Sequence, residues 1–174
     1  MSFPAFNRKR ILRWTIEILL FLVVLYGVQH WRTRGATSGT APPLDRLLID
    51  GEVFSLTAAP RPLLVYFWGT WCPVCRMQQG AVDALAEDAG VITLALSSGS
   101  DEDIAAYLGQ HGLDFPVVND EDGSIAAQWG VQGVPTSFII DEKDQVRFVT
   151  SGYTTGPGLR ARLWLTRLQA SPHR

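Results

Sequence analysis

Apolar residues along the chain fall into one long run and several short ones. The long run, WTIEILLFLVVLYGVQHW over residues 14–31, contains a single charged residue, Glu17. As a helix it would rise about 27 Å, roughly the thickness of the hydrocarbon core of a bilayer. Trp14 at one end, with Tyr26 and Trp31 at the other, stand where interfacial aromatic residues are common. The pattern therefore predicts a transmembrane helix over residues 14–31.

Basic residues flank this run unequally, with four over residues 8–13 and two over residues 32–34. The positive-inside rule then places residues 1–13 in the cytoplasm as a basic end and exports the rest of the chain on a single-pass anchor. Glu17 lies one helical turn from Arg13, where pairing reduces the cost of a charge near the edge of the span. A cleaved signal peptide has a similar pattern, but no A-x-A-like site follows the apolar run, which favours an uncleaved signal anchor.

The rest of the chain divides into a linker, a domain and a tail. Residues 32–43, ending in RGATSGTAPP, are small or polar residues and prolines without periodicity, which predicts a flexible linker. Residues 44–170 contain the short apolar runs of a folded domain, and residues 171–174 form the tail. The total length suits one domain of ordinary size.

The short runs predict strands that alternate with helices. Asp50-Gly51 between apolar residues is a hairpin signal. Continuous apolar runs over residues 63–68 and 91–96 are typical of buried strands. We expect the helix between these strands to be interrupted by Gly80 and ended by Gly90.

The second half of the domain continues the alternation. Ser100 and Asp103 resemble a capping box that begins a helix over residues 101–112. Four shorter segments follow, and the pattern assigns them as extended over 115–118, helical over 123–129, and extended over 136–140 and 145–150. The last helix is amphipathic, and its predicted apolar side consists of Leu159, Leu163, Trp164 and Leu168.

Alternating strands and helices predict an α/β fold with a mixed sheet flanked by helices on both faces. The late hairpin would supply antiparallel strands at the edge of this sheet. In such sheets, chemistry collects where the carboxyl end of a strand leads into the N-terminus of a helix. Cys72 and Cys75, the two cysteines of the chain, lie at such a junction after the strand over residues 63–68.

Charge also divides the chain into two parts. Residues 1–40 carry six Arg or Lys and one acidic residue, whereas residues 41–174 carry nine basic and sixteen acidic residues, a balance of −7. Phosphate binding requires clustered positive charge, so the acidic body argues against nucleic acid as a partner.

The cysteine spacing suits redox chemistry. Two residues at i and i+3 in a first helical turn have Cα atoms within disulfide range. Cys72 would lie beside the free amides and the positive end of the helix dipole, which lower a thiol pKa, so it is the predicted nucleophile. Pro73 suits the first helical position, and Val74 keeps the intervening pair uncharged. Cys75, one turn deeper, is the predicted resolving thiol.

Other roles for the cysteines find less support. A zinc site needs four ligands, and the histidines, His30, His111 and His173, are scattered without ligand spacing. A purely structural disulfide across so short a loop would add little stability. A cysteine peroxidase would need P-x-x-x-T-x-x-C, but Gly69 replaces the threonine. A Cu(I)-binding module remains the alternative, because soft thiolates suit Cu(I). No cofactor is indicated.

The motif VYFWGTWCPVC, followed about sixty residues later by GVPTSFIID, resembles the thioredoxin superfamily. With the anchor, the sequence is most similar to its TlpA-like branch and to the suppressor-of-copper-sensitivity D proteins of bacterial envelopes. The resemblance implies a periplasmic thiol-disulfide oxidoreductase anchored in the inner membrane. It also implies exported cysteine-containing proteins as substrates, a membrane electron-transfer partner of the DsbD/ScsB type, and a role in copper tolerance. Pro135 would be a cis-proline beside the disulfide, and Val134 would offer its backbone to a partner.

The chain departs from these families beneath the cysteines. Thioredoxin has a buried Asp where this sequence has Tyr66, and several TlpA-like reductases have a Glu where it has Gln78. Neither residue can accept the Cys75 proton as a carboxylate would, although both could also be ordinary packing or surface residues. Deprotonation of Cys75 would then rely on water or on the departing thiolate, so we predict slower and more pH-dependent resolution than in a Glu-bearing relative. Trp68 is predicted in the core, and Trp71 beside the partner groove.

Overall fold

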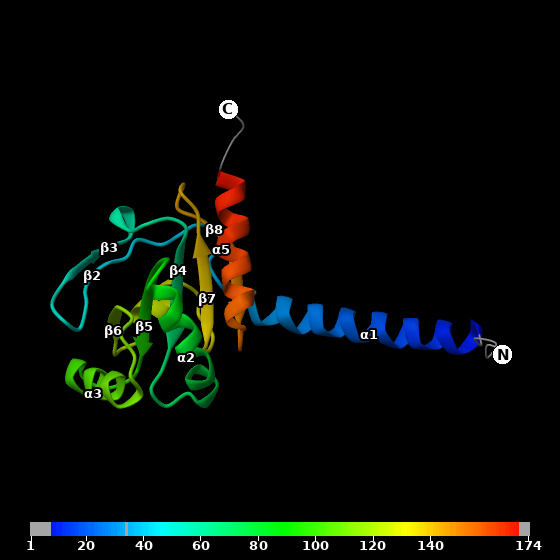
Figure 1. Cartoon of the computed structure of the whole chain (residues 1–174), viewed down its shortest axis with the longest axis horizontal. Helices are drawn as coiled ribbons and strands as arrows, with labels where there is room; N and C mark the ends of the chain where they lie inside the picture. Colours follow the sequence, from blue (N-terminus) through cyan, green and yellow to red (C-terminus); the bar gives the residue numbers. More distant parts are fainter. Residues whose placement is uncertain (1–7, 34, 171–174) are drawn as a thin grey trace. The chain divides into compact units, whose positions relative to one another are not determined.

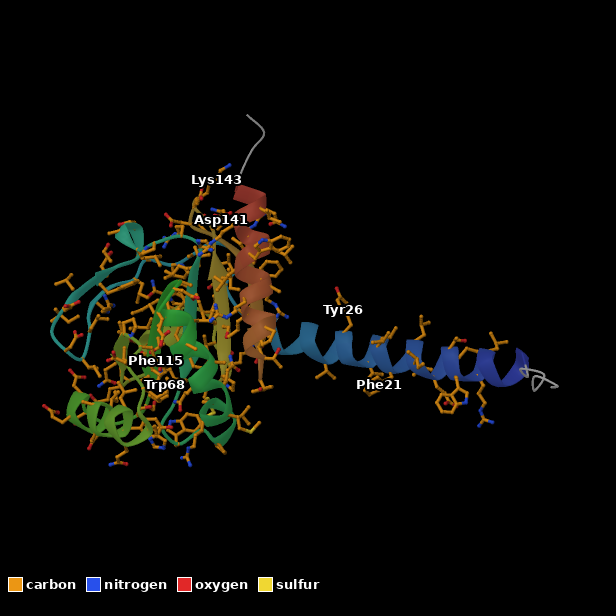
Figure 2. The ribbon with its side chains drawn as sticks, viewed as in Figure 1. Phe21, Tyr26, Trp68, Phe115, Asp141 and Lys143 are labelled. Atoms are coloured by element: carbon orange, nitrogen blue, oxygen red, sulfur yellow. A yellow bond between two sulfur atoms is a disulfide. The ribbon has the colours of Figure 1, made fainter. Side chains whose placement is uncertain are left out.

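The computed structural model describes residues 8–33 and 35–170, which fall into two units, 1–34 and 35–174. The first unit is the helix α1 (Arg8–Thr33), whose described apolar side chains are exposed, among them Phe21 and Tyr26 (Figure 2). Arg13 pairs with Glu17, with 3.3 Å between Nε and Oε1, at the predicted helical spacing. Within the described residues, no helix combines the length and the apolar content that crossing a membrane requires. That residues 14–31 span a membrane stays a prediction, and the tail over 171–174 lies outside the described residues.

The second unit is built on a six-stranded sheet with the order β1-β8-β7-β4-β5-β6 (Figure 1). Its strands are β1 (Gly39–Thr40), β4 (Leu63–Trp68), β5 (Gly90–Leu96), β6 (Val117–Asp120), β7 (Thr136–Ile140) and β8 (Gln145–Ser151). The pairs β4/β5 and β5/β6 are parallel, whereas β7 is antiparallel to both β4 and β8. The predicted mixed sheet is therefore confirmed.

Helices cover both faces of this sheet. They are α2 (Pro73–Ala86), α3 (Asp101–His111), α4 (Ser124–Gln128) and α5 (Gly156–Ala170), with a short 3-10 helix η1 (Leu56–Ala58). One core cluster joins alternate residues of β4 to α2, α3 and α5, and a second joins the other residues of β4 to α4. Within the first cluster, Trp68 packs edge-on against Phe115, with ring centroids 5.6 Å apart (Figure 2). The predicted α/β class is confirmed.

The central strand forms as its sequence predicts. All six residues of β4 are buried, because this strand has neighbours on both sides and helices on both faces. The predicted hairpin also forms: β2 (Asp45–Leu47) pairs with β3 (Val53–Ser55) across Asp50-Gly51. Gly51 has φ +88°, a conformation that glycine adopts without strain. The capping box of Ser100 and Asp103 is present as predicted.

The prediction that Gly80 interrupts the helix and Gly90 ends it is wrong. Helix α2 runs without a break through Gly80 and ends at Ala86, and Gly90 is the first residue of β5. Packing explains the continuity, because Val82 and Leu85, beyond the glycine, are buried in the core. Tertiary contacts of this kind commonly override a weak helix propensity.

The predicted apolar side of the last helix is also partly wrong. Leu159 and Leu163 are buried together with Thr166, whereas Trp164 and Leu168 are 58% and 52% exposed. At 100° per residue, positions 159, 163 and 166 share one face of α5, and positions 164 and 168 point away from it.

Part of the predicted linker over residues 32–43 is ordered on the domain. Thr37 N donates to Trp129 O (3.0 Å), and Ala41 N donates to Asp144 O (2.8 Å). Between them, β1 pairs with β8 at the edge of the sheet. Pairing through backbone groups needs no apolar side-chain pattern, so composition alone assigned this segment incorrectly.

Candidate active site

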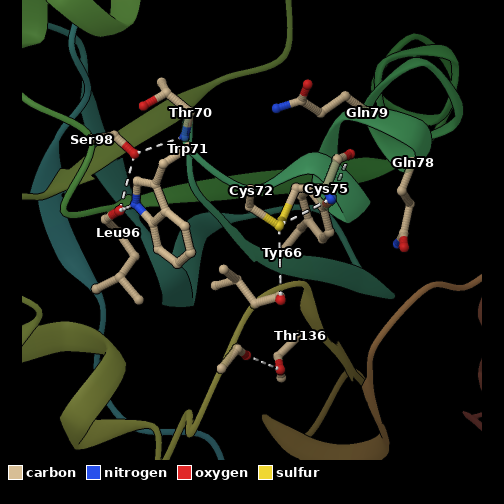
Figure 3. Close-up of a disulfide and its surroundings, with 12 residues drawn as sticks. Tyr66, Thr70, Trp71, Cys72, Cys75, Gln78, Gln79, Leu96, Ser98 and Thr136 are labelled. Carbon is tan, nitrogen blue, oxygen red and sulfur yellow. Dashed lines mark hydrogen bonds between the residues drawn. A yellow bond between two sulfur atoms is a disulfide. The ribbon is translucent and has the colours of Figure 1, made fainter.

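The two cysteines lie where the chain passes from β4 into α2. They form a disulfide with Cα atoms 5.3 Å apart (Figure 3). Cys72 is the N-cap of α2, and its Sγ accepts a hydrogen bond from Cys75 N (3.1 Å). Pro73 occupies the first turn, where a missing N–H is not needed. The free amides and the helix dipole therefore face Cys72 and would stabilise its thiolate after reduction.

The two sulfurs differ less in burial than the sequence suggested. Cys75 is fully buried, as predicted, but Cys72 is only 4% exposed. The surface around them is more open, because Trp71 is 58% and Val74 is 40% exposed. A partner therefore has to reach Cys72 across these two side chains.

The loop before β7 lies against the disulfide. Val134 O is 3.8 Å from Cys72 Sγ, and the Val134–Pro135 peptide bond is cis, as the resemblance implied. Gly152 N donates to Pro135 O (2.8 Å), which joins this loop to the end of β8. The backbone of Val134 thus lies beside the sulfur that a partner would attack.

The indole of Trp71 is fixed although it is exposed. Its Nε1 donates to Leu96 O (3.1 Å), and Ser98 Oγ donates to the same oxygen (3.0 Å) while accepting from Thr70 N (3.1 Å) (Figure 3). A Cβ on Gly69 would lie 2.8 Å from two atoms of the Trp71 ring. Glycine at position 69 therefore makes room for the ring beside the disulfide.

Beneath the disulfide lies a buried phenol. Tyr66 is fully buried, and its hydroxyl donates to Cys75 O over a long 3.5 Å. Burial, and secondarily the nearby Tyr107, raise the pKa of Tyr66 above its ordinary value. Tyr66 is therefore a neutral donor at working pH and cannot serve as the base for Cys75.

Comparison with known proteins fits this arrangement. A sequence profile described as Redoxin matches residues 36–162, which is most of the chain. The chain belongs to the Redoxin family. It is 31% identical over 159 residues to a thioredoxin-like protein of Haemophilus influenzae, covering 90% of this chain and 95% of that protein. It is 27% identical over 167 residues to the thiol-disulfide oxidoreductase ResA of Geobacillus thermodenitrificans, covering 90% and 96%.

A solved structure agrees with the fold of this redoxin. The crystal structure of StoA from Bacillus subtilis superposes with a TM-score of 0.60 at 25% identity, covering 70% of this chain and 96% of that one. The predicted enzyme class, a thioredoxin-like thiol-disulfide oxidoreductase, is confirmed by relatives of that class and by the cysteine pair of this chain.

This redoxin has two buried glutamines one turn beyond Cys75. Gln78 is fully buried, and its Oε1 accepts from Thr154 N (2.9 Å). Gln79 is 1% exposed, and its Oε1 accepts from the Tyr107 hydroxyl (2.9 Å). Gln78 is thus not a surface residue, and sequence reasoning missed Gln79, Thr154 and Tyr107 altogether. Helical spacing from Cys75 was the only available signal for Gln79.

Metal binding at this site could use only the two sulfurs. Across residues 8–33 and 35–170, no group of three or more His, Cys, Asp or Glu side chains is placed to hold a metal ion. The reduced pair of Cys72 and Cys75 could offer two thiolates, a donor set that suits Cu(I) better than zinc.

Proposed function

We propose that this redoxin exchanges disulfides with exported cysteine-containing proteins, with Cys72 as nucleophile and Cys75 as resolving thiol. The observation that carries the proposal is the Cys72–Cys75 disulfide at the N-terminus of α2, beside the Val134 carbonyl. A buried pair that closes without moving the backbone suits a reversible redox reaction.

The reaction has two exchange steps. The Cys72 thiolate attacks one sulfur of a partner disulfide, and the other partner sulfur leaves as a thiolate with the electron pair of the broken bond. Cys75 then loses its proton and attacks Cys72 Sγ, which releases the second partner sulfur. The partner gains two electrons and two protons, and the protein is oxidised to its disulfide. The reverse sequence oxidises a partner dithiol.

The surface beside the disulfide supports recognition of a protein partner. Trp71 is exposed but fixed by its bond to Leu96 O, so it can contact a partner at little cost in side-chain entropy. Val74 adds apolar surface, and the backbone of Val134 is placed to position a partner segment beside Cys72.

Trapping of mixed disulfides tests this function. The Cys75→Ser protein keeps the nucleophile but lacks the resolving thiol, so it should accumulate disulfide-linked partners in non-reducing gels. The matched Cys72→Ser protein should trap far fewer, because its remaining thiol is fully buried. A Cu(I)-binding module would give a different result: both variants would lose metal, and neither would trap proteins. Absence of any trapped partner with Cys75→Ser would contradict the exchange function.

We also propose that residues 14–31 anchor the protein in the bacterial inner membrane, with residues 1–13 in the cytoplasm and the domain in the periplasm. The support is the apolar run and the excess of basic residues before it. Carbonate extraction should leave the protein in the membrane pellet, and protease added to spheroplasts should digest the domain. A mature N-terminus after Val28, detected by mass spectrometry, would contradict the anchor.

A membrane electron-transfer partner of the DsbD/ScsB type would supply the electrons, and the resemblance to suppressor-of-copper-sensitivity D proteins suggests that the pathway serves copper tolerance. Acid quenching and thiol alkylation in cells should find Cys72 and Cys75 mainly reduced when the partner is present. Deleting the partner should shift the pair to the disulfide, because the periplasm is kept oxidising. An unchanged redox state would exclude this source of electrons.

A further inference from the structure

Several polar atoms on the Cys75 side of the sheet are buried without a partner. Among the described residues, the unpartnered atoms on this side are Gln78 Nε2, Gln79 Nε2, Thr154 Oγ1 and Ser137 Oγ. Gln78 is fully buried, and Ser137 and Thr154 are 3% and 7% exposed. An unsatisfied buried polar atom costs about 1–3 kcal/mol, so four in one region call for an explanation.

The Gln78 amide has a fixed orientation. Its Oε1 accepts from the backbone N–H of Thr154, a donor that cannot be exchanged for an acceptor. Nε2 is therefore the free end of the amide, and its two N–H groups need acceptors. Thr154, whose backbone N–H donates to Gln78, also has a hydroxyl, which can both donate and accept a hydrogen bond.

Gln78 lies one helical turn from the resolving thiol, and Thr154 is bonded to Gln78. Cys75 and Gln78 share the buried side of α2 (Figure 3). They are three residues apart, a spacing that in helices generally places Cβ atoms about 5–6 Å apart. Ser137 is the β7 partner of Tyr66, whose hydroxyl reaches Cys75 O. Paired residues in an antiparallel sheet point to the same face, so Ser137 faces the same core cluster as Cys75.

The buried carboxylates are engaged by backbone groups rather than by Cys75. Among the described residues they are Asp120 and Asp141, and each accepts hydrogen bonds from backbone N–H groups close to it in the sequence. The phenols packed in the cluster around Cys75 are Tyr66 on β4 and Tyr107 on α3. From α5 and β7 this cluster receives Leu159, Leu163 and Ile139. A fully buried thiol in such surroundings needs an acceptor other than a side-chain carboxylate, and a buried water or a released partner thiolate could serve.

We propose that Gln78 and Thr154 position a buried water beside Cys75, and that this water takes the Cys75 proton during resolution. A water with two to four polar partners is stable inside a protein and would satisfy Nε2 and Oγ1 together. Gln78 is then a positioning residue that replaces a buried carboxylate. The inference deepens the proposed exchange reaction and rests on it.

The proton transfer completes the second exchange step. The Cys75 S–H proton passes to the water and from there to bulk solvent, which leaves the electron pair on Cys75 sulfur. The thiolate attacks Cys72 Sγ, the bond between Cys72 and the partner breaks, and the partner sulfur leaves with its electron pair. The departing thiolate takes up a proton from solvent, so charge balances over the step.

Single-turnover reaction with Ellman's reagent separates the two steps. Reduced full-length protein, mixed with one equivalent of reagent, releases a first thionitrobenzoate when Cys72 attacks and a second when Cys75 resolves. The second phase, followed from pH 5 to 9, reports deprotonation of Cys75, and Cys75→Ser should abolish it. A wild-type protein without a first phase would contradict the exchange function itself, whereas the inference is judged on the second phase alone.

Gln78→Met should slow the second phase about tenfold at pH 7 and move its pH midpoint upward by about one unit, since one pKa unit is tenfold in thiolate. The first phase should stay within about twofold, which also shows that the variant is folded. The matched variant is Gln79→Met, the same change in the adjacent buried amide. Gln79 also has an unpartnered Nε2, but its Oε1 is bonded to the Tyr107 hydroxyl and not to Thr154, so the variant should leave the second phase within about twofold. Equal effects of the two variants would overturn the assignment.

Thr154→Val tests the same water with a smaller change. Valine has nearly the shape of threonine, and the backbone bond to Gln78 Oε1 remains, so only the unpartnered hydroxyl is lost. We expect a second phase three- to tenfold slower, against no change in Thr166→Val, whose buried hydroxyl donates instead to Arg162 O (2.9 Å). A second phase unchanged in both Gln78→Met and Thr154→Val would overturn the proposal.

Discussion

Replacing Tyr66 by phenylalanine should change how the stability of this redoxin depends on pH. Tyr66 is fully buried at the centre of the sheet, and burial raises the pKa of its phenol above the ordinary value of 10.0. The folded protein therefore keeps the phenol protonated at a pH where the unfolded chain releases the proton. Stability from this group is present below about pH 10 and is lost as the pH rises above it.

The size of the effect follows from the unfolded chain. At pH 11 an exposed tyrosine with a pKa of 10.0 is ionised about ten to one, so unfolding becomes easier by about 1.4 kcal/mol relative to pH 8. Tyr66→Phe has no phenol and escapes this loss. At pH 8 the variant loses only the 3.5 Å bond to Cys75 O, which we expect to cost less than about 1 kcal/mol.

Urea unfolding of the oxidised full-length protein, followed by tryptophan fluorescence at pH 8, 9, 10 and 11, measures this difference. Between pH 8 and 11 the wild type should lose about 1.4 kcal/mol more stability than Tyr66→Phe. Tyr153→Phe, which removes an exposed phenol, is the control and should follow the wild type. Parallel losses in the wild type and Tyr66→Phe would refute the argument that burial keeps this phenol protonated.

Four further substitutions test other parts of the domain. Gly80→Ala should raise the free energy of unfolding by about 0.5–1 kcal/mol in urea melts, because the added Cβ meets nothing within 4 Å inside α2; a destabilised variant would contradict this. Gly90→Ala should lower the free energy of unfolding by more than about 1 kcal/mol in the same melts, since its Cβ would lie 2.6 Å from a backbone carbonyl oxygen. An unchanged urea midpoint would show that the neighbouring backbone shifts to make room. Gly69→Ala should displace the Trp71 indole and shift its fluorescence, at a cost of about 1 kcal/mol for the lost hydrogen bond; an unaltered spectrum would argue against the tight fit. Gln78→Glu should supply a carboxylate acceptor and change the pH-rate profile of resolution, so an identical profile would exclude proton transfer at this position.

The parts of the fold that the sequence predicts are those where local pattern and tertiary packing agree. Residues 63–68 are apolar throughout, and β4 is buried on both faces, so pattern and structure coincide. Pro73 after Cys72 marks the beginning of α2 in both. Where pattern and packing disagree, packing decides: Gly80 is a weak helix former, yet α2 continues because Val82 and Leu85 have to reach the core.

The parts that could not be predicted depend on contacts between distant segments. Glutamine is usually exposed, so nothing in the sequence shows that Gln78 is buried until Thr154, 76 residues away, is seen to donate to it. The same holds for Gln79 and Tyr107, which come from different helices. Strand β1 could not be predicted for another reason. It is held to β8 by backbone hydrogen bonds, and its small residues show no apolar pattern typical of a strand.

The neutral surroundings of Cys75 have a physical consequence for both redox states. A carboxylate at position 78 would be fully buried, and desolvation would raise its pKa and cost stability whenever it was ionised. The amide of Gln78 avoids this cost in the oxidised protein, where no proton acceptor is needed. In the proposed exchange reaction it also removes a base, so resolution would begin from the Cys75 thiol and an acceptor other than a buried carboxylate. Around Cys75 the core thus does not depend on a buried carboxylate at position 78, and in the proposed reaction the resolution rate would depend on the pKa of one buried thiol.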